Sequence, residues 1–447
     1  MNLKNETPSW VEGTNIIETA YVKYFLSIHP LMCINENFYD VDGAYSKAAI
    51  RKSVTMDISK YMKSDVANKV TKIINLMTDI TSKEDIIVEK EWLFFKNGDF
   101  NISERKLYPK ERICLYRLPV SYNPDAHEPI ITKSFLNTLL EPMDVKTLQE
   151  FIGYMFLTSN PAQKMLMILG RGGEGKSQVG EMVKALFGDY CINGSIADLS
   201  SNKYIGPMLE FKNVFLDDDM KLSALKDTDL LKKIITNNGK LMLEKKFKDI
   251  FQGYVYVKLM AFGNGSLKSL YDRSMGFYRR QIVLTAKKIP EGRETDPFLG
   301  EKIKSEAEGI LLWALEGLYR LSENNFQFTI SDSAKRNIQK IMDEQDTVGA
   351  FLKSKGYIQF GPENKSSTRA LYKAYCEFCD NNNVNKVAQQ SFNSYLSENG
   401  EEYGLKYSKH IKGLYGVESR GYLGVCTRLD YNQDMTWSNT PQDKYYE

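Results

Sequence analysis

The sequence predicts an α/β protein whose core is a parallel sheet with helices on both faces. A glycine-rich stretch, residues 170–177, follows the apolar run 164–169 and precedes a helical pattern that ends at Gly188. Strand, loop and helix in this order are typical of one repeating unit of such a sheet. Further apolar runs alternate with helical patterns, as a parallel sheet requires. These runs are residues 213–216, 254–262 and 281–284.

The composition is that of a globular protein without a membrane segment. Of 447 residues, 42% are hydrophobic and 26% are charged, which is ordinary for folded domains. No apolar run reaches the roughly 18 residues that a membrane span needs, and the N-terminus lacks the apolar segment of a secretory signal. Six scattered cysteines fit a reducing compartment, so we expect a cytoplasmic protein. The net charge of +2 does not indicate nucleic acid, and any basic surface must be local.

Residues 1–130 are predicted to form a mixed α/β domain ahead of the core. Their pattern predicts a strand or hairpin at residues 31–39, a helix at 58–76 and a strand at 91–95. The second predicted domain covers residues 131–325 and begins with helices at 132–140 and 145–157.

The glycine-rich stretch spells G-x-x-x-x-G-K-S, the pattern of a phosphate-binding loop. Backbone N–H groups of such a loop and the dipole of the following helix attract phosphate oxygens. Lys176 would contact the β- and γ-phosphates of ATP, and the Ser177 hydroxyl would hold Mg²⁺. A glycine-rich turn that binds nothing is the alternative. The predicted nucleotide contacts are Gly170, Gly172, Gly173, Glu174, Gly175, Lys176, Ser177 and Gln178.

Three acids follow the apolar run 213–216, namely Asp217, Asp218 and Asp219. At the carboxyl edge of a parallel sheet, one acid can orient Mg²⁺ and another can polarise the attacking water. We choose Asp218 and Asp219 for these two roles, with Ser177 and Asp218 at the metal; three consecutive acids leave their register open. Asp217 is the fallback, and a solvated acidic loop is the alternative.

Residues 239–253, predicted as a hairpin or an extended basic excursion, carry the densest basic patch of the chain. Residues 232–258 contain seven lysines but only two acids, and Phe247 and Phe251 lie among them. Lysines can contact DNA phosphates and aromatic rings can stack on bases, although most charge runs are solvated faces. The predicted DNA contacts are Lys245, Lys246 and Lys248.

Asn264 and the pair Arg279–Arg280 complete the candidate catalytic set. Asn264 ends an apolar strand, where a neutral amide can hold the attacking water. Asparagine between two glycines is otherwise most often a turn residue. The arginines precede the run 281–284 and could be fingers that reach the γ-phosphate of a neighbouring subunit. That role requires a ring of subunits, and surface ion pairs are the alternative.

The rest of the chain predicts two helices and a small third domain. The helices are expected at residues 301–321 and 332–353, and residues 326–354 form a linker helix. Residues 355–430 then combine short helices with a glycine-punctuated hairpin at 416–429. Residues 431–447 form a polar tail.

In this order the motifs resemble those of superfamily 3 helicases of the phage/plasmid primase–helicase type. The chain is similar to replication helicases of satellite phages, poxviruses and staphylococcal pathogenicity islands. The phosphate loop is the family's first motif, Asp217–Asp219 its second and Gly263–Asn264 its third. Further similar segments are residues 92–98, 117–119, 122–126, 148–154, 243–249 and 276–280.

The resemblance implies a hexameric ring of modified AAA+ ATPases that moves 3′ to 5′ on single-stranded DNA. It places Lys246 and Lys248 on a hairpin that contacts DNA in the central channel. Residues 1–130 then correspond to a helicase-associated domain and residues 355–430 to a winged-helix DNA-binding domain. Because the chain begins at the helicase-associated region, we expect a separately encoded primase as a partner.

We therefore expect an ATP- and Mg²⁺-dependent replicative DNA helicase of a mobile genetic element, acting in replication initiation. Its partners would be single-stranded DNA, origin duplex DNA and further copies of itself as a homohexamer. One alternative is an origin-binding initiator ATPase that melts or marks DNA without processive unwinding. Another is a small-molecule kinase, which would need neither the basic hairpin nor arginines from a neighbouring subunit.

Overall fold

The computed structural model describes residues 7–83, 88–202, 204–220, 228–244, 246, 250–264, 275–289, 292, 296–382, 384, 386–412 and 418–430. The chain divides into two compact units, Met1–Asn337 and Ile338–Glu447, and each is described here by itself. The division lies within helix α12, Asp332–Gln345, inside the predicted linker.

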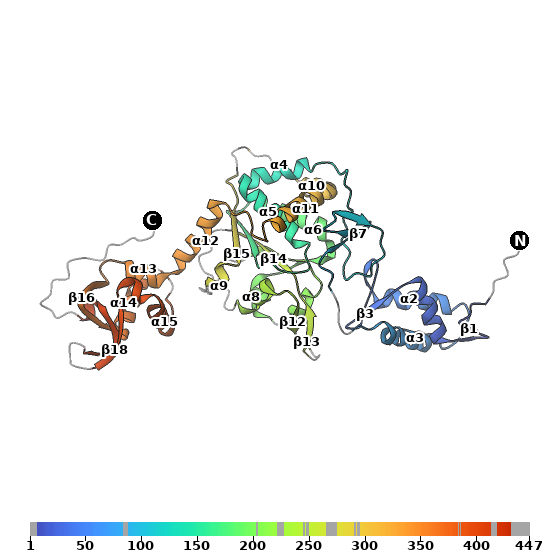
Figure 1. Cartoon of the computed structure of the whole chain (residues 1–447), viewed down its shortest axis with the longest axis horizontal. Helices are drawn as coiled ribbons and strands as arrows, with labels where there is room; N and C mark the ends of the chain where they lie inside the picture. The colour runs from blue at the N-terminus through green and yellow to red at the C-terminus, as the bar shows by residue number, and fades with distance from the viewer. Residues whose placement is uncertain are drawn as a thin grey trace. The chain divides into compact units, whose positions relative to one another are not determined.

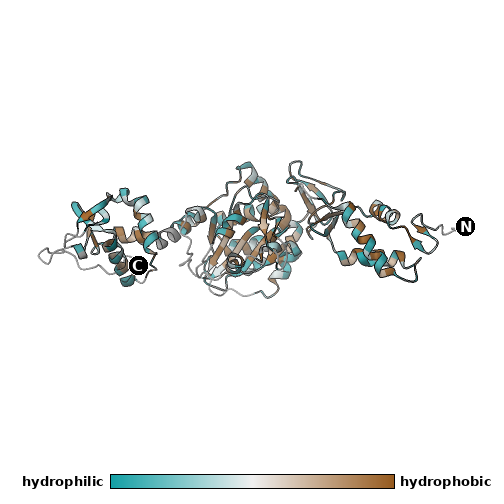
Figure 2. Ribbon diagram, turned by 90° about the horizontal axis from the view of Figure 1, so that it is seen from below, coloured by the Kyte–Doolittle hydropathy of each residue, from teal (hydrophilic) through white to brown (hydrophobic). Residues whose placement is uncertain are grey.

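A five-stranded parallel sheet forms the centre of the first unit (Figure 1), which confirms the α/β prediction. Its strands are mostly apolar and buried (Figure 2). The strand order across the sheet is β10-β11-β14-β9-β15. The five strands are β9 Met165–Gly170, β10 Cys191–Asn193, β11 Val214–Met220, β14 Lys258–Asn264 and β15 Gln281–Thr285.

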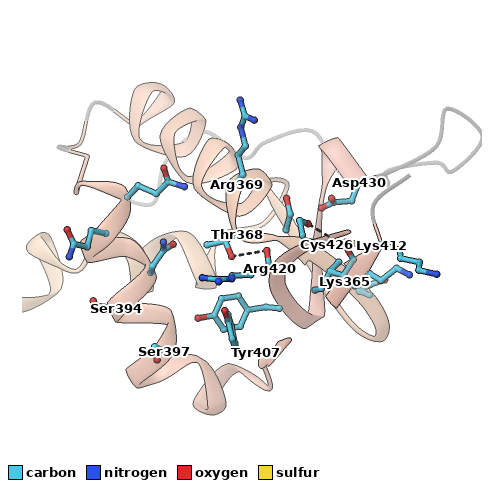
Figure 3. A pocket seen from close by; sticks show the side chains of 18 of the residues that line it. Lys365, Thr368, Arg369, Ser394, Ser397, Tyr407, Lys412, Arg420, Cys426 and Asp430 are labelled. Atoms are coloured by element: carbon cyan, nitrogen blue, oxygen red, sulfur yellow. Dashed lines mark hydrogen bonds between the residues drawn. The ribbon is translucent and has the colours of Figure 1, made fainter. Parts of the chain in front are cut away.

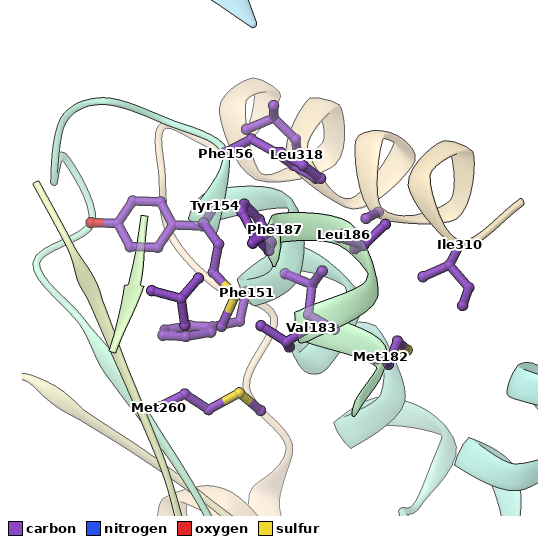
Figure 4. Close-up of a cluster of buried hydrophobic side chains, with 14 of the residues drawn as sticks. Phe151, Tyr154, Phe156, Met182, Val183, Leu186, Phe187, Met260, Ile310 and Leu318 are labelled. Atoms are coloured by element: carbon purple, nitrogen blue, oxygen red, sulfur yellow. The ribbon is translucent and has the colours of Figure 1, made fainter. Parts of the chain in front are cut away.

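Helices cover this sheet on both faces (Figure 1). On one face, α5 and α11 cross so closely that a Cβ atom at Gly153 would lie 2.4 Å from the Ala314 carbonyl oxygen. Phe151, Val183 and Phe187 pack there against Met260 of the sheet (Figure 4). This face carries α4 Ile130–Leu139, α5 Pro142–Met155, α6 Lys176–Phe187, α10 Leu299–Ser305 and α11 Ala307–Glu323. The other carries α7 Ile196–Ser201 and α8 Asp229–Thr236; short elements are η1 Gly188–Tyr190, η2 Gly206–Leu209 and α9 Met275–Tyr278.

The N-terminal part of this unit has a second hydrophobic core, which includes Trp10, Tyr21 and Phe25. The predicted hairpin at residues 31–39 is confirmed as the antiparallel pair β3–β4. The helices are α1 Glu18–Ile28, α2 Lys47–Ile58 and α3 Val66–Thr81. The strands are β1 Val11–Glu12, β2 Asn15–Ile16, β3 Met32–Ile34, β4 Asn37–Asp40, β5 Gly43–Tyr45, β6 Trp92–Phe95, β7 Gly98–Asn101 and β8 Lys106–Tyr108.

The helix predicted at residues 58–76 is wrong at its start. Helix α2 ends at Ile58 and α3 begins at Val66, after Asp65 in the left-handed region at φ 57°. Tyr61 and Met62 of the connection pack on the same core as the helices. Their burial continues the apolar spacing across the break, so the pattern hides it.

Three further predictions need correction at element ends. The strand predicted at 254–262 begins at Lys258, because Val255 to Val257 form a buried link without strand pairing. The helix predicted at 301–321 is split between α10 and α11 at Glu306, whose carboxylate accepts the Ile131 and Thr132 N–H groups at 2.9 and 2.8 Å. The helix predicted at 332–353 is split where Asp346 accepts the Gly349 N–H at 2.8 Å and so starts α13.

The second unit places three helices against a three-stranded antiparallel sheet of order β16-β18-β17. Phe351, Tyr375, Phe378 and Phe392 fill its core. The hairpin predicted within residues 416–429 is wrong, because Glu418–Thr427 forms one strand, β18. Its antiparallel partner is β17, Lys406–Lys412, which lies before the predicted range. The elements are α13 Thr347–Lys353, β16 Ile358–Ser367, α14 Thr368–Asn381, α15 Gln389–Asn399, η3 Gly400–Tyr403, β17 Lys406–Lys412, β18 Glu418–Thr427 and η4 Arg428–Asp430.

None of the helices in the described part of the chain combines the length and the apolar character that a bilayer crossing requires.

Candidate active site

The glycine-rich loop connects β9 directly to the N-terminus of α6. Gly172, Gly173 and Gly175 have φ angles of 108°, 83° and 100°, a region that glycine adopts at little cost and other residues rarely adopt. These angles turn the chain sharply from the end of the strand into the helix. The N-cap residue of α6 is Gly175, and no side chain caps the helix there. Among the residues that the structure describes, no side chain caps the first N–H groups of α6, which is the condition for an anion site.

The loop exposes some of its residues and buries others. Arg171, Gly172, Gly173 and Ser177 are exposed, so a ligand can reach the loop backbone and the serine hydroxyl. Glu174 and Lys176 are buried, with 4% and 7% of their surface exposed. The arrangement fits the phosphates of a nucleotide outside the loop and an ion pair beneath it.

The buried ion pair connects the loop to the neighbouring strand. Lys176 Nζ lies 2.8 Å from Glu174 Oε2 and 3.0 Å from the side-chain oxygen Oδ1 of Asn264. Asn264 ends β14, which pairs with β9 so that Asn264 lies opposite Gly170. The structure thus brings together Lys176 and Asn264, which the sequence places 88 residues apart.

The Glu174 carboxylate is held in its charged form. Burial alone would raise its pKa, but hydrogen bonds from Lys176 and from the Arg171 backbone N–H group outweigh burial and lower the pKa to about 2. Glu174 is therefore an anion throughout the neutral range.

The three acids at the end of β11 lie in different environments. Asp217 is buried, and its carboxylate accepts the Ile196 N–H group at the start of α7 at 2.7 Å. Burial raises the pKa of Asp217. Asp218 is exposed on the opposite face, toward α6, where its Oδ2 lies 3.3 Å from Lys184 Nζ. Asp219 is also exposed. Asp217 therefore has a structural contact, whereas Asp218 faces the helix that carries Ser177.

Two features of α6 explain how the Asp218 carboxylate comes so close to this helix. A Cβ atom at Gly180 would lie 2.9 Å from Asp218 Oδ1, so only glycine leaves room for this carboxylate. Lys184 follows Ser177 by seven residues and Gly180 by four, which places all three on one helix face. The sequence reasoning missed Lys184, although this spacing was available as a signal.

Arg279 and Arg280 lie at the opposite edge of the sheet. The Arg280 carbonyl oxygen accepts the Met165 N–H group at 2.8 Å, and Met165 is the first residue of β9. The loop begins at the other end of β9, roughly 17 Å away, because five steps of about 3.3 Å separate Met165 from Gly170. The Arg280 guanidinium donates to the Gly276 carbonyl oxygen. Within one chain, neither arginine lies beside the phosphate loop.

The predicted hairpin is confirmed as the antiparallel pair β12 Lys240–Leu243 and β13 Phe251–Tyr254. The Asn237 amide donates to the carbonyl oxygens of Gly239 and Val255 at 2.7 and 2.6 Å and so joins the two sides at the base. Lys246 is exposed between the two strands. Lys245 and Lys248 lie outside the described residues.

A groove of about 1260 Å³ in the second unit was not predicted as a site. It lies between α15, the end of β16 and the strands β17 and β18 (Figure 3). Thr368 donates to the Arg420 carbonyl oxygen at 3.1 Å across it. Its cationic lining residues are Lys365, Arg369, Lys412 and Arg420, its acids are Glu363 and Asp430, and its amides are Asn364, Gln389, Gln390 and Asn393.

The fold of this chain is similar to that of solved structures of one region of another protein, NrS-1. The A-form apo structure of the C-terminal region of NrS-1 matches with a TM-score of 0.53 and 13% identity, covering 90% of this chain and 98% of that one. An apo structure of the same region, residues 305–718, matches with a TM-score of 0.55 and 14% identity over the same shares. At this identity the likeness shows the fold alone.

A family model described as "Family of unknown function (DUF5906)" matches residues 168–280. The match runs from within β9 to Arg280 and contains the phosphate loop, the three acids, Asn264 and both arginines. No curated protein matches the chain.

Proposed function

We propose that this protein is an ATP-dependent DNA helicase with an AAA+-type core, acting in the replication of a mobile genetic element. The contact between Lys176 Nζ and Asn264 Oδ1, 3.0 Å apart, carries the proposal. It joins the phosphate lysine to the amide that would hold the attacking water. Strand β14 lies between β9 and β11, so the carboxyl ends that bear the loop, the amide and the acids are adjacent.

The residues of this edge fit ATP hydrolysis. The open N-terminus of α6 and the loop N–H groups would bind the phosphates, and Lys176 would contact the γ-phosphate. Ser177 and Asp218 would hold Mg²⁺, which supplies positive charge against the β- and γ-phosphate oxygens. Asp219 would polarise the attacking water, and Asn264 would orient it without adding negative charge.

The position of the arginines supports a site shared between subunits. The distance along β9 from Arg279 and Arg280 to the loop is longer than an arginine side chain. A finger role for either residue therefore requires a second copy of the chain. We propose the hexameric ring and the 3′-to-5′ movement that the family resemblance implies.

Two surfaces are proposed for DNA. Lys246 and its neighbours on the hairpin would contact the backbone of a single strand. In the second unit, one helix, one strand, two helices and a hairpin follow in the order α13, β16, α14, α15, β17, β18, which supports a winged-helix domain. The groove between α15 and the hairpin combines cations for phosphates with amides that can hydrogen-bond base edges (Figure 3).

The test is ATP hydrolysis and unwinding of a forked duplex by the full chain and by Lys176→Ala. We expect hydrolysis that single-stranded DNA stimulates, strand separation that needs ATP, and loss of both in the variant. Lys60→Ala, which removes a lysine on an exposed ion pair with Asp57, is the matched control and should behave as wild type. A folded Lys176→Ala variant with full turnover would contradict the assigned site.

The groove also favours the second candidate, an origin-binding initiator that does not unwind processively. The same assay separates the two functions. DNA-stimulated hydrolysis without strand separation, together with tight binding to one duplex sequence, would identify the initiator. Alanine at Arg369 and Arg420 should then weaken duplex binding and leave basal hydrolysis unchanged.

A further inference from the structure

We infer that Glu174 is a positioning residue, which holds the ammonium group of Lys176 and the first half of the loop in the arrangement that receives phosphate. The inference rests on the proposed function and deepens it, because it concerns the same nucleotide site. The loop pattern itself leaves this position open to any residue.

The Glu174 side chain turns back into its own loop. Its carboxylate accepts the Arg171 backbone N–H group and, with both oxygens, the Gly172 N–H group at 3.1 and 3.0 Å. A Cβ atom at Gly170 would lie 2.7 Å from both carboxylate oxygens, so only glycine at Gly170 accommodates this arrangement. The carboxylate thus occupies a space that the loop encloses.

Lys176 completes the set of contacts. An ammonium group has three N–H donors, and here two of them reach Glu174 Oε2 and Asn264 Oδ1. Both acceptors are fixed, one by the loop backbone and one at the end of β14. The third donor is then directed by the other two, which defines where a phosphate oxygen can be bound.

The charge of the pair has a second effect. The carboxylate offsets the positive charge of the ammonium group 2.8 Å away, so Glu174 contributes orientation and reduces the attraction for phosphate. Orientation acts on the rate of the chemical step, whereas attraction acts on nucleotide binding. Removing the negative charge of Glu174 should therefore lower kcat without raising KM.

Glu174→Gln tests this separation because it keeps the shape and removes the charge. In steady-state ATP hydrolysis by the full chain, we expect kcat to fall by about tenfold, as for a misplaced catalytic group, with KM unchanged or lower. Glu181→Gln is the matched control: Glu181 lies on α6 together with Lys176, pairs with Lys184 and Lys304 at 3.1 and 2.7 Å, and does not contact Lys176.

A second measurement needs no nucleotide. Hydrogen exchange of the peptide that contains Arg171 and Gly172 should be slow in the free wild-type protein and faster in Glu174→Ala, which removes the acceptor of both N–H groups. Equal exchange in the two proteins would overturn the inferred contacts.

The kinetic outcomes also decide the inference. Wild-type kcat and KM in Glu174→Gln, or a parallel loss of binding, turnover and thermal stability, would overturn the positioning role and leave the proposed function standing. A wild-type protein that binds no nucleotide would overturn the proposed function and this role together, even with slow exchange at Arg171 and Gly172.

Discussion

Neighbouring residues of identical chemistry have different tasks in this structure. Asp217 and Asp218 are adjacent on β11, and alternation along the strand directs them to opposite faces. Asp217 accepts the Ile196 N–H group, whereas Asp218 lies beside Gly180 and Lys184 of α6. Of these two acids, Asp218 is therefore the one that faces the helix carrying Ser177.

We predict opposite effects of substitution at the two acids. Asp217→Ala leaves a buried N–H group without its acceptor and should cost about 1–3 kcal/mol of stability, with little change in turnover per folded molecule. Asp218→Asn should lower kcat by about 100-fold and barely change stability, because its ion pair with Lys184 is partly exposed. Urea denaturation and ATP hydrolysis measure the two effects, and the reverse pattern would exchange the assignments.

We predict that the stability of the folded protein depends on pH through Glu174. Its pKa is lowered from 4.5 to about 2, so the folded state binds this proton less readily than the unfolded state. The stabilisation is fully present above about pH 4.5 and is lost as the pH falls toward 2. The stability difference between wild type and Glu174→Gln should therefore shrink between pH 6 and about pH 3. Both proteins contain the other carboxyl groups, so a difference that stays constant would contradict the shift.

At this scale the sequence predicts the loop but not the position of its side chains. The spacing of Gly170, Gly175 and Lys176 predicts a phosphate-binding loop. The Glu174 side chain turns inward because of three glycine φ angles and the position of the Lys176 side chain. A sequence pattern contains neither backbone angles nor side-chain positions. The choice among the acids depends on which face α6 covers, and this requires the folded sheet.

At the scale of elements, the hairpin β12–β13 is separate from the sheet edge that carries the candidate site. It leaves the sheet before β14 begins, and Asn237 ties its base. Changes near its tip should therefore leave the nucleotide site intact, so hydrolysis and DNA contact can be separated by mutation.

We predict that Lys246→Ala with Lys248→Ala uncouples hydrolysis from unwinding. Basal hydrolysis should persist, while stimulation by single-stranded DNA and strand separation fall. Each lost phosphate contact should reduce the salt slope of binding by about 0.7, so about 1.4 for two contacts. Lys52→Ala with Lys63→Ala removes two exposed lysines elsewhere and is the control. Loss of basal hydrolysis with unchanged DNA binding would move the lysines to the active site.

Element types followed from the sequence better than element ends did. The alternation of strands and helices in the first unit and the hairpin β12–β13 were predicted, whereas β16 and β17 of the second unit were not. The break between α2 and α3 was not, because Tyr61 and Met62 pack like helix residues. The break between α10 and α11 depends on Glu306 accepting two N–H groups of α4, a contact between segments about 175 residues apart.

At the scale of the whole molecule, the proposed finger role would leave the candidate site incomplete in one chain. The phosphate loop lies at one edge of the sheet and the arginines at the other. No pattern in a single sequence states that a second copy supplies the missing group, so the arginine role depends on assembly.

We predict that inactive variants complement one another in mixed assemblies. Arg280→Ala, or Arg279→Ala, lacks the finger, and Lys176→Ala lacks the phosphate contact. A mixture contains interfaces with an intact loop on one side and an intact arginine on the other, and should recover part of the hydrolysis rate. Light scattering confirms that mixed assemblies form. No recovery at any ratio of verified mixed assemblies would contradict a site shared between chains.

The length of β9 has a further consequence for how the protein would be controlled. If every working centre requires two chains, the specific rate per chain depends on dilution, and a scarce protein is silent whatever the supply of ATP. A linear assembly of subunits always leaves one loop without arginines at one end and one pair of arginines without a loop at the other. Closing the assembly into a ring brings these two ends together. Early in expression, the copy number of the protein would then set the moment at which hydrolysis begins.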